Sequence, residues 1–335
     1  MKLKTRILEK YLFYILVISH CLIIFQVPVF ITQDGPSHLY NSKIVLDFLI
    51  QNNTDFYSEF YHLNISNYPN WFSSVILSCL LFFFSPVISE KIFICALVCS
   101  LPIAIRYLCY QTKSNALYLS SIAFILSNGF FLYYGFYNFL WSISMMILFI
   151  STYFQQESNK SAKNIIKILV ISVLIYFTHP VSFVNIIMFV GFDLLLNDNK
   201  NDFGNKLKKA FALIPALILF LFFFISNRDQ SNSLFQNKLD YNHIKQLFIP
   251  DHLTVFHTSE SWINTTSVFI LLGIIVFGII IKKKHVNKAI LFLLLANGFI
   301  YFFINDALVG GSYLTPRIGI IVQLCFLMLA IPINI

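Results

Sequence analysis

The stretch from Tyr11 to Asn41 reads YLFYILVISHCLIIFQVPVFI followed by TQDGPSHLYN, and it decides the fold class of the chain. Its first part, residues 11–31, is an apolar run of the length that a helix needs to cross a bilayer, about 20 residues. Its second part places a carboxylate, a Gly-Pro turn and a histidine directly after that run. An uncleaved membrane-spanning helix is therefore predicted to lead into a polar loop.

The composition of the whole chain agrees with this prediction. Of its 335 residues, 58% are hydrophobic and only 11% are charged, far from the usage of soluble globular proteins. The net charge of +8 comes from short basic clusters between apolar runs, a pattern typical of cytoplasmic loops, so nucleic-acid binding is not expected. We predict an all-α, polytopic protein of the bacterial inner or plasma membrane, with its N-terminus in the cytoplasm.

The apolar runs predict a bundle of about ten spans. Two regions are ambiguous, namely residues 71–86 and residues 165–196, which His179-Pro180 interrupts. Proline in a helix interior costs about 3 kcal/mol, so a break is predicted there. The clear runs are residues 11–31, 88–110, 115–131, 136–154, 210–226, 263–281, 289–304 and 317–335.

The distribution of basic residues distinguishes two topologies. If residues 71–86 are a half-helix and residues 165–196 are two short spans, 17 of the 23 basic residues face the cytoplasm. If residues 71–86 cross fully and residues 165–196 form one long span, 13 do so. The positive-inside rule favours the first topology, which brings the polar loops together on the external face.

Asp34 and His38 are the first candidates for chemistry. Asp34 lies at the exit of the first span, where it could cap a helix over residues 36–50 or act as a general base. His38 follows four residues later, on the same side if the helix begins at Asp34. Asn41 ends this polar segment. The helix over residues 36–50 is predicted to lie on the membrane surface.

Further polar residues belong to the other predicted external segments. Tyr68, Asn70 and Trp71 end a segment rich in Tyr and Asn, which suits either a carbohydrate surface or an interfacial aromatic belt. Asn138 opens a span, where it could cap the helix or contact a ligand. His179 could line a cavity or be buried in the bilayer.

Arg317 heads the last apolar run from the external side, against the charge bias. An arginine there could bind phosphate oxygens or snorkel to the membrane interface. No metal site is expected, because the spacing of His243, His252 and His257 matches no zinc pattern. The six cysteines fall in or beside apolar runs without a CxxC motif, so we interpret them as packing residues.

This layout resembles the GT-C superfamily of membrane glycosyltransferases, over about residues 1–196. The resemblance lies in an acidic residue after the first span (Asp34), an external loop ending in Pro69-Asn70-Trp71, a second external turn at residues 129–138 and short spans hinged at His179. Many family members carry an Asp-Glu pair where this chain has Asp34-Gly35, and an acidic residue where it has Asn138. These departures concern the reaction and its metal dependence, whereas the architecture is unaffected.

The resemblance implies a donor sugar linked to a polyprenyl phosphate and a lipid or glycan acceptor, in contact with membrane lipids. Asp34 would be the catalytic base, and His38, Asn41, Tyr68, Asn70, Trp71, Asn138, His179 and Arg317 would bind substrate. No cofactor is implied, although a divalent metal stays open. The module would cover residues 1–226, followed by an external loop (227–262) and C-terminal helices (263–335). The chain stops inside an apolar run, so a missing C-terminal portion stays open.

A second class of function fits the same composition. A transporter or flippase for lipid-linked saccharides, or an assembly subunit, would also be rich in apolar helices. Transporters bind near the membrane midplane and often contain internal repeats. The polar residues of this chain are instead predicted at one face, and no repeat is visible, which favours the enzyme.

Overall fold

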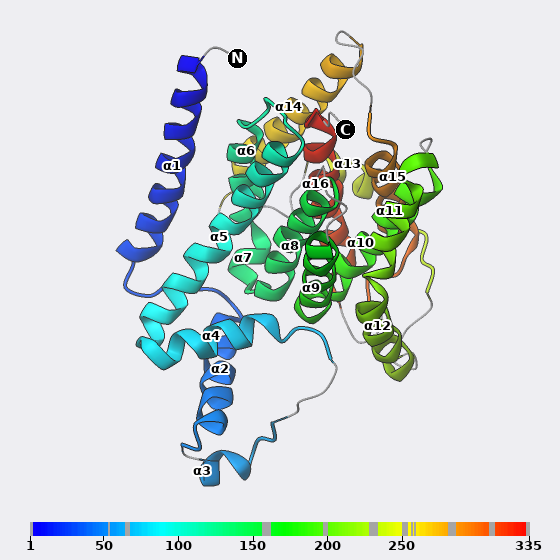
Figure 1. Ribbon diagram of the computed structural model, residues 1–335. Coiled ribbons are helices and arrows are strands. Elements are labelled where there is room, and N and C mark those ends of the chain that lie inside the picture. Colours follow the sequence, from blue (N-terminus) through cyan, green and yellow to red (C-terminus); the bar gives the residue numbers. More distant parts are fainter. Residues whose placement is uncertain are drawn as a thin grey trace.

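The computed structural model describes residues 3–52, 54–63, 68–155, 162–196, 200–227, 234–249, 254–255, 257, 259–280, 286–307 and 312–332. Within these ranges the regular secondary structure is helical, and the loops contain one isolated β-bridge, between Phe235 and Ile304. The all-α prediction is thus confirmed (Figure 1). The helices are α1 (Leu3–Gln26), α2 (Gly35–Leu49), α3 (Thr54–Ser58), α4 (Phe72–Phe83), α5 (Pro86–Gln111), α6 (Leu119–Ser127), α7 (Phe130–Tyr134), α8 (Tyr137–Tyr153), α9 (Ala162–Thr178), α10 (Pro180–Leu195), α11 (Lys200–Phe211), α12 (Ile214–Asn227), α13 (Tyr241–Phe248), α14 (Glu260–Ile280), α15 (Lys288–Phe303) and α16 (Leu314–Ala330).

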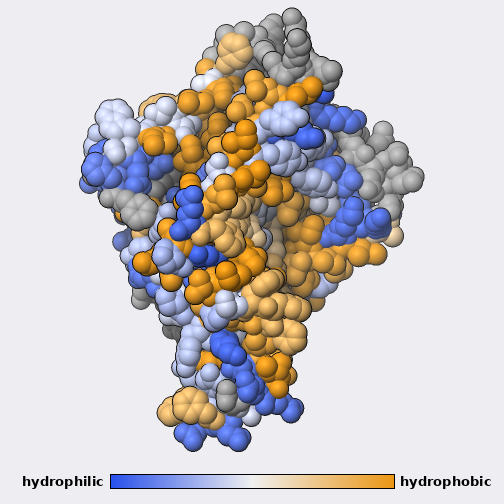
Figure 2. Space-filling view, turned by 90° about the vertical axis from the view of Figure 1, so that its left-hand side faces the viewer, coloured by the Kyte–Doolittle hydropathy of each residue, from blue (hydrophilic) through white to orange (hydrophobic). Residues whose placement is uncertain are grey.

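A few helices are long and apolar enough to cross a membrane. Among the described residues these are three, in α1, α5 and α14, and a fourth if α11 and α12, bent by 47°, form one span. The other apolar helices are shorter, so the count of about ten spans stays a prediction. Apolar residues cover much of the middle of the face in Figure 2, while hydrophilic residues gather at its lower end.

The first helix ends earlier than the sequence predicts, at Gln26 rather than at residue 31. Pro28 accounts for this end, because a proline disfavours helical geometry at the residue before it. The backbone oxygens freed at the helix end are not left unpaired. The Lys91 Nζ on α5 donates to the carbonyls of Phe25, at 3.3 Å, and Val27, at 2.5 Å.

The proline break at His179-Pro180 is confirmed, since α9 ends at Thr178 and α10 begins at Pro180. The ambiguous region 71–86 is a separate helix, α4, which ends before Pro86 starts α5. The apolar run 115–131 differs from a single span. It divides at Gly129 into α6 and the short α7.

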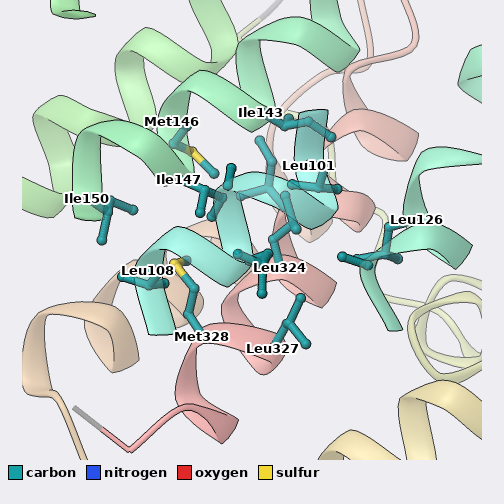
Figure 3. Packing of buried hydrophobic residues seen from close by; sticks show 14 of the residues in the cluster. Leu101, Leu108, Leu126, Ile143, Met146, Ile147, Ile150, Leu324, Leu327 and Met328 are labelled. Atoms are coloured by element: carbon teal, nitrogen blue, oxygen red, sulfur yellow. The ribbon is translucent and has the colours of Figure 1, made fainter. Parts of the chain in front are cut away.

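The core of the bundle is formed where α5, α6, α8 and α16 meet. Their leucine, isoleucine and methionine side chains point toward one another in Figure 3. Close apolar packing of this kind holds helices together in water and in lipid alike, because it depends on van der Waals contact. The labelled members are Leu101, Leu108, Leu126, Ile143, Met146, Ile147, Ile150, Leu324, Leu327 and Met328.

Helices α2 and α3 project beyond the end of α1, away from the N-terminus (Figure 1). The buried side of α2 packs on α4, where the Ser78 hydroxyl donates to the Ser42 carbonyl at 2.8 Å. Within α2, Lys43 pairs with the fully buried Asp47 at 2.7 Å. The predicted helix over residues 36–50 is therefore present, while its placement on a membrane surface stays a prediction.

Helix α1 is joined to α5 near its other end by a buried ion pair. The Arg106 guanidinium donates to both oxygens of Glu9, at 2.6 and 2.9 Å, and lies 4.3 Å from the Phe13 ring. Forked pairs of this kind are among the strongest hydrogen-bonded contacts in proteins. Most of the remaining surface of α1 is exposed, so this pair carries much of its attachment.

Removing one partner of this pair should detach α1. We expect Arg106→Met to lower the free energy of unfolding by about 3–5 kcal/mol, because Glu9 would stay buried without a counter-charge. The double variant Glu9→Leu with Arg106→Met should recover most of the loss. Thermal unfolding in detergent measures both effects, and equal stability of the single and double variants would contradict the assignment.

Candidate functional site

A cavity of about 890 Å³ lies where the first loop meets α8, α10, α12 and α16. It is large enough for a drug-sized or sugar-sized ligand. Seven of the nine residues singled out from the sequence line it, although they come from five separate segments. These seven are Asp34, His38, Tyr68, Asn70, Asn138, His179 and Arg317.

The remaining two lie outside the cavity lining. Asn41 is exposed on α2, although His38 on the same helix lines the cavity. Trp71 precedes α4, and its backbone N–H donates to the Phe177 carbonyl at 3.0 Å. Trp71 thus connects the end of the first loop to α9. Because Trp71 does not line the cavity, its predicted contact with substrate stays a prediction.

The Asp34 turn is held by backbone contacts. The N–H groups of Gln33 and Asp34 donate to the carbonyls of Tyr133 and Tyr134, at 2.8 and 3.2 Å. Gly135 has a φ of +86°, and a Cβ there would stand 2.9 Å from the Cβ of Asp34. Only glycine allows both this backbone conformation and this close approach.

The Asp34 side chain is left available for chemistry. Asp34 occupies the N-cap position of α2, as one reading of the sequence predicts, yet its side chain accepts no capping hydrogen bond. Its backbone carbonyl accepts instead, from the His38 N–H at 3.0 Å. A half-buried carboxylate in a cavity wall, free of capping, can accept a proton or a hydroxyl hydrogen bond from a ligand.

His38 closes the site from α2. Its ring stacks obliquely on Tyr137, with centroids 5.1 Å apart. Burial lowers the pKa of His38 below its ordinary value, while a hydrogen bond to the Gly135 backbone and the charge of Asp34 act in the opposite direction. We infer that His38 is neutral at pH 7 and connects α2 to the turn at Gly135.

Asn138 acts as a clamp between α8 and the first loop. Its side-chain oxygen accepts from the Ser73 N–H at 2.8 Å, and its nitrogen donates to the Asn70 carbonyl at 2.9 Å. Asn138 thus caps α4, a helix 65 positions earlier in the chain, rather than its own helix. Asn70, held at a φ of +71°, keeps its side chain exposed in the cavity wall.

His179 faces the cavity from the break between α9 and α10. The Val181 N–H donates to its Nδ1 at 3.2 Å, so that nitrogen carries no proton. The ring edge packs against Phe139, with centroids 5.4 Å apart. The geometry therefore fits a neutral imidazole whose Nε2–H can donate to a ligand.

Arg317 provides a positive charge at the cavity wall. One Nη donates to the Ser312 carbonyl at 3.0 Å, and the guanidinium lies 4.8 Å from the Phe136 ring. Its Nε is buried without a hydrogen-bond partner among the described residues. No ion pair with Arg317 is found in the part of the chain that the structure describes. Its unused donors suit an anionic group.

The far part of the cavity is apolar. Valines of α10, phenylalanines of α12 and isoleucines of α15 form its walls. Phe224 lines the cavity, and its neighbours Phe222 and Ile225 on α12 are 62% and 61% exposed outside that lining, so α12 presents apolar side chains both to the cavity and to the exterior. Tyr68 from the first loop meets the Phe223 ring edge-on, at 5.7 Å. One cavity thus joins polar groups to an apolar wall.

Several lining residues have no counterpart in the sequence analysis. Tyr137 is fully buried beside Asn138, Asn185 follows His179 by six residues, and Asn227 ends α12. Tyr137 and Asn185 could have been found from the sequence only through their closeness along the chain to Asn138 and His179. Among the described residues, no three His, Cys, Asp or Glu side chains are grouped to hold a metal ion, and His252 lies outside those residues.

The glycine at 135 gives a direct test of the turn. We expect Gly135→Ala to lower the free energy of unfolding by at least about 1–2 kcal/mol, because alanine is strained at this φ and its Cβ would meet Asp34. Gly298→Ala is the matched control, since open space surrounds that helical glycine. Thermal unfolding compares the two, and equal effects would contradict the tight turn.

The lowered pKa of His38 predicts that the stability of the fold depends on pH. Its lowered pKa means that the unfolded chain binds a proton more readily, so stability should be retained above the ordinary value of about 6.5 and fall as the pH drops below it. His38→Gln should reduce this acid sensitivity, and Ser151→Ala, which removes a buried hydroxyl of α8 that does not titrate in this range, should leave it unchanged. Unfolding midpoints between pH 5 and 8 measure the difference, and identical curves for all three proteins would exclude His38.

Comparisons with known proteins give no neighbour for this arrangement. No protein-family model, no characterised protein and no solved structure shows significant similarity to the chain.

Proposed function

We propose that the chain is an integral membrane glycosyltransferase of the GT-C type. It would move a sugar from a polyprenyl-phosphate donor to a lipid or glycan acceptor at the external membrane face. The observation that carries the proposal is one cavity whose wall contains both the Asp34 carboxylate and the Arg317 guanidinium and whose apolar part is formed in part by α12, a helix with exposed apolar side chains on its other side.

The polar and apolar parts of the cavity match the parts of such a donor. A polyprenyl chain requires apolar walls that are continuous with the bilayer, and α10, α12 and α15 supply them. The phosphate requires positive charge and hydrogen-bond donors, for which Arg317 and the His179 Nε2–H are suited. The exposed amide of Asn70 is suited to the hydroxyl groups of a sugar.

The proposed reaction is a direct displacement at the anomeric carbon. The acceptor oxygen forms a bond to that carbon while the bond from carbon to the phosphate oxygen breaks, and the electron pair of that bond leaves with the lipid phosphate. Asp34 takes the proton of the acceptor hydroxyl. Negative charge grows on the departing phosphate, where Arg317 would stabilise it.

The alternative is a transporter or flippase for the same lipid-linked saccharides. It would also need an amphiphilic cavity, but one that can open to both faces of the membrane. What favours transfer is the Asp34 carboxylate, which makes no capping bond and no ion pair within the described part of the chain, because transport alone requires no base. Movement of a fluorescent lipid-linked sugar across vesicles, without transfer, would favour the alternative.

The Asp34 carboxylate is tested by an isosteric change. We expect Asp34→Asn to lower sugar transfer by about 100- to 10,000-fold, as for loss of a general base, while the protein stays folded. Asp240→Asn is the matched control, because Asp240 caps the exposed α13 outside the cavity. Membranes carrying each variant are incubated with a panel of polyprenyl-phosphate sugars. Near-normal transfer by Asp34→Asn would refute its role.

A further inference from the structure

Helix α11 presents an apolar stripe to the outside of the bundle. Phe203, Leu207 and Phe211 recur every fourth residue along this helix, and all three are exposed. After α11 the chain bends by 47° into α12, and the two helices together are long and apolar enough to cross a membrane. Exposed phenylalanine and leucine on a helix that also carries lysines are typical of the boundary between lipid headgroups and acyl chains.

The lysines of α11 have two different roles. Lys206 pairs with Asp193 at the end of α10, at 2.8 Å, and Lys209 donates to the Tyr153 carbonyl at the end of α8, at 2.6 Å. These two contacts fasten α11 to the bundle. Lys208 is exposed, and its ammonium group makes no hydrogen bond or ion pair within the described part of the chain. Lys208 is therefore available to a group from outside the protein.

Helix α9, which contacts α11, carries a groove of about 400 Å³ near its start. Two lysines four residues apart, and hence on the same side of the helix, line the groove together with apolar side chains. The described residues of this lining are Lys163, Ile166, Lys167, Val170 and Ile171. The Lys167 ammonium group makes no hydrogen bond or ion pair with any described residue. Positive charge and an apolar wall thus lie side by side.

This surface of α9 and α11 is positively charged and separate from the candidate functional site. Among the described side chains of α9, α10 and α11 the one acidic group is Asp193, which Lys206 neutralises. Lys163 lies near the start of α9, whereas His179 follows its end, about 24 Å away at 1.5 Å per residue. In Figure 1, α11 lies in the upper half of the bundle, far from α2 and α3.

We propose that the surface formed by α9 and α11 binds an anionic phospholipid. The lipid phosphate lies against Lys163 and Lys167, and one acyl chain follows the apolar side chains of the groove. Beside it, Lys208 and the phenylalanines of α11 keep that helix in the headgroup layer. A zwitterionic headgroup is disfavoured, because these lysines would repel its ammonium group and no unpaired carboxylate of the described side chains faces it.

Lipid titration tests the charge. The full-length protein in nonionic detergent is titrated with fluorescent phosphatidylglycerol and with phosphatidylcholine of the same chain length. We expect Lys167→Gln and Lys208→Gln each to weaken phosphatidylglycerol binding by about fivefold, and the double variant by about 25-fold, with phosphatidylcholine binding unchanged. Lys245→Gln is the matched control, because Lys245 is an exposed lysine of α13 outside this surface, and it should bind both lipids like the wild type.

Competition with inorganic phosphate tests whether the acyl chain takes part. Phosphate in 100-fold molar excess should displace little phosphatidylglycerol, because it lacks the chain that fills the groove. Complete displacement would overturn the proposal, since it would indicate a site for any anion. Equal affinities for the two lipids would overturn it as well, and so would wild-type affinity in the double variant. None of these measurements uses sugar transfer, so their outcome is independent of the proposed function.

Discussion

The site depends on the backbone contact between the loop after α1 and the turn before α8. Two hydrogen bonds, from Gln33 and Asp34 to the Tyr133 and Tyr134 carbonyls, fix the carboxylate in the cavity wall. The positive φ of Gly135 makes room for this contact. Because main-chain atoms form these bonds, they hold the base in place without using its carboxyl oxygens.

Around this contact, side chains that look catalytic in the sequence divide into two groups. Asn138 uses both ends of its amide to join α8 to the start of α4, and His38 joins α2 to Gly135. Asp34, Asn70, His179 and Arg317 line the cavity with polar side chains. The proposed chemistry needs only this second group to touch substrate, while the first group keeps it aligned.

The sequence predicted those features whose cause is local. The break at His179-Pro180 follows from the geometry of proline, and the helical class follows from the apolar runs. The early end of α1 was missed, because it depends on Lys91 as well as on Pro28. The capping of α4 by Asn138 could not be predicted, since the two lie far apart in the chain. The same holds for the side-chain oxygens of Thr32, Tyr137 and Glu90, which meet around Gly35.

The long sequence separation within the site has a consequence for biogenesis. The segment with Asp34 leaves the ribosome about a hundred residues before its partners at Tyr133 and Tyr134, a delay of about 5–20 s at usual translation rates. During that time α1 is already made, but Lys91 and Arg106, which secure it, emerge only in the second half of the interval. The nascent loop cannot form these two bonds until α7 follows, so the turn that positions Asp34 closes only after more than a third of the chain has been made.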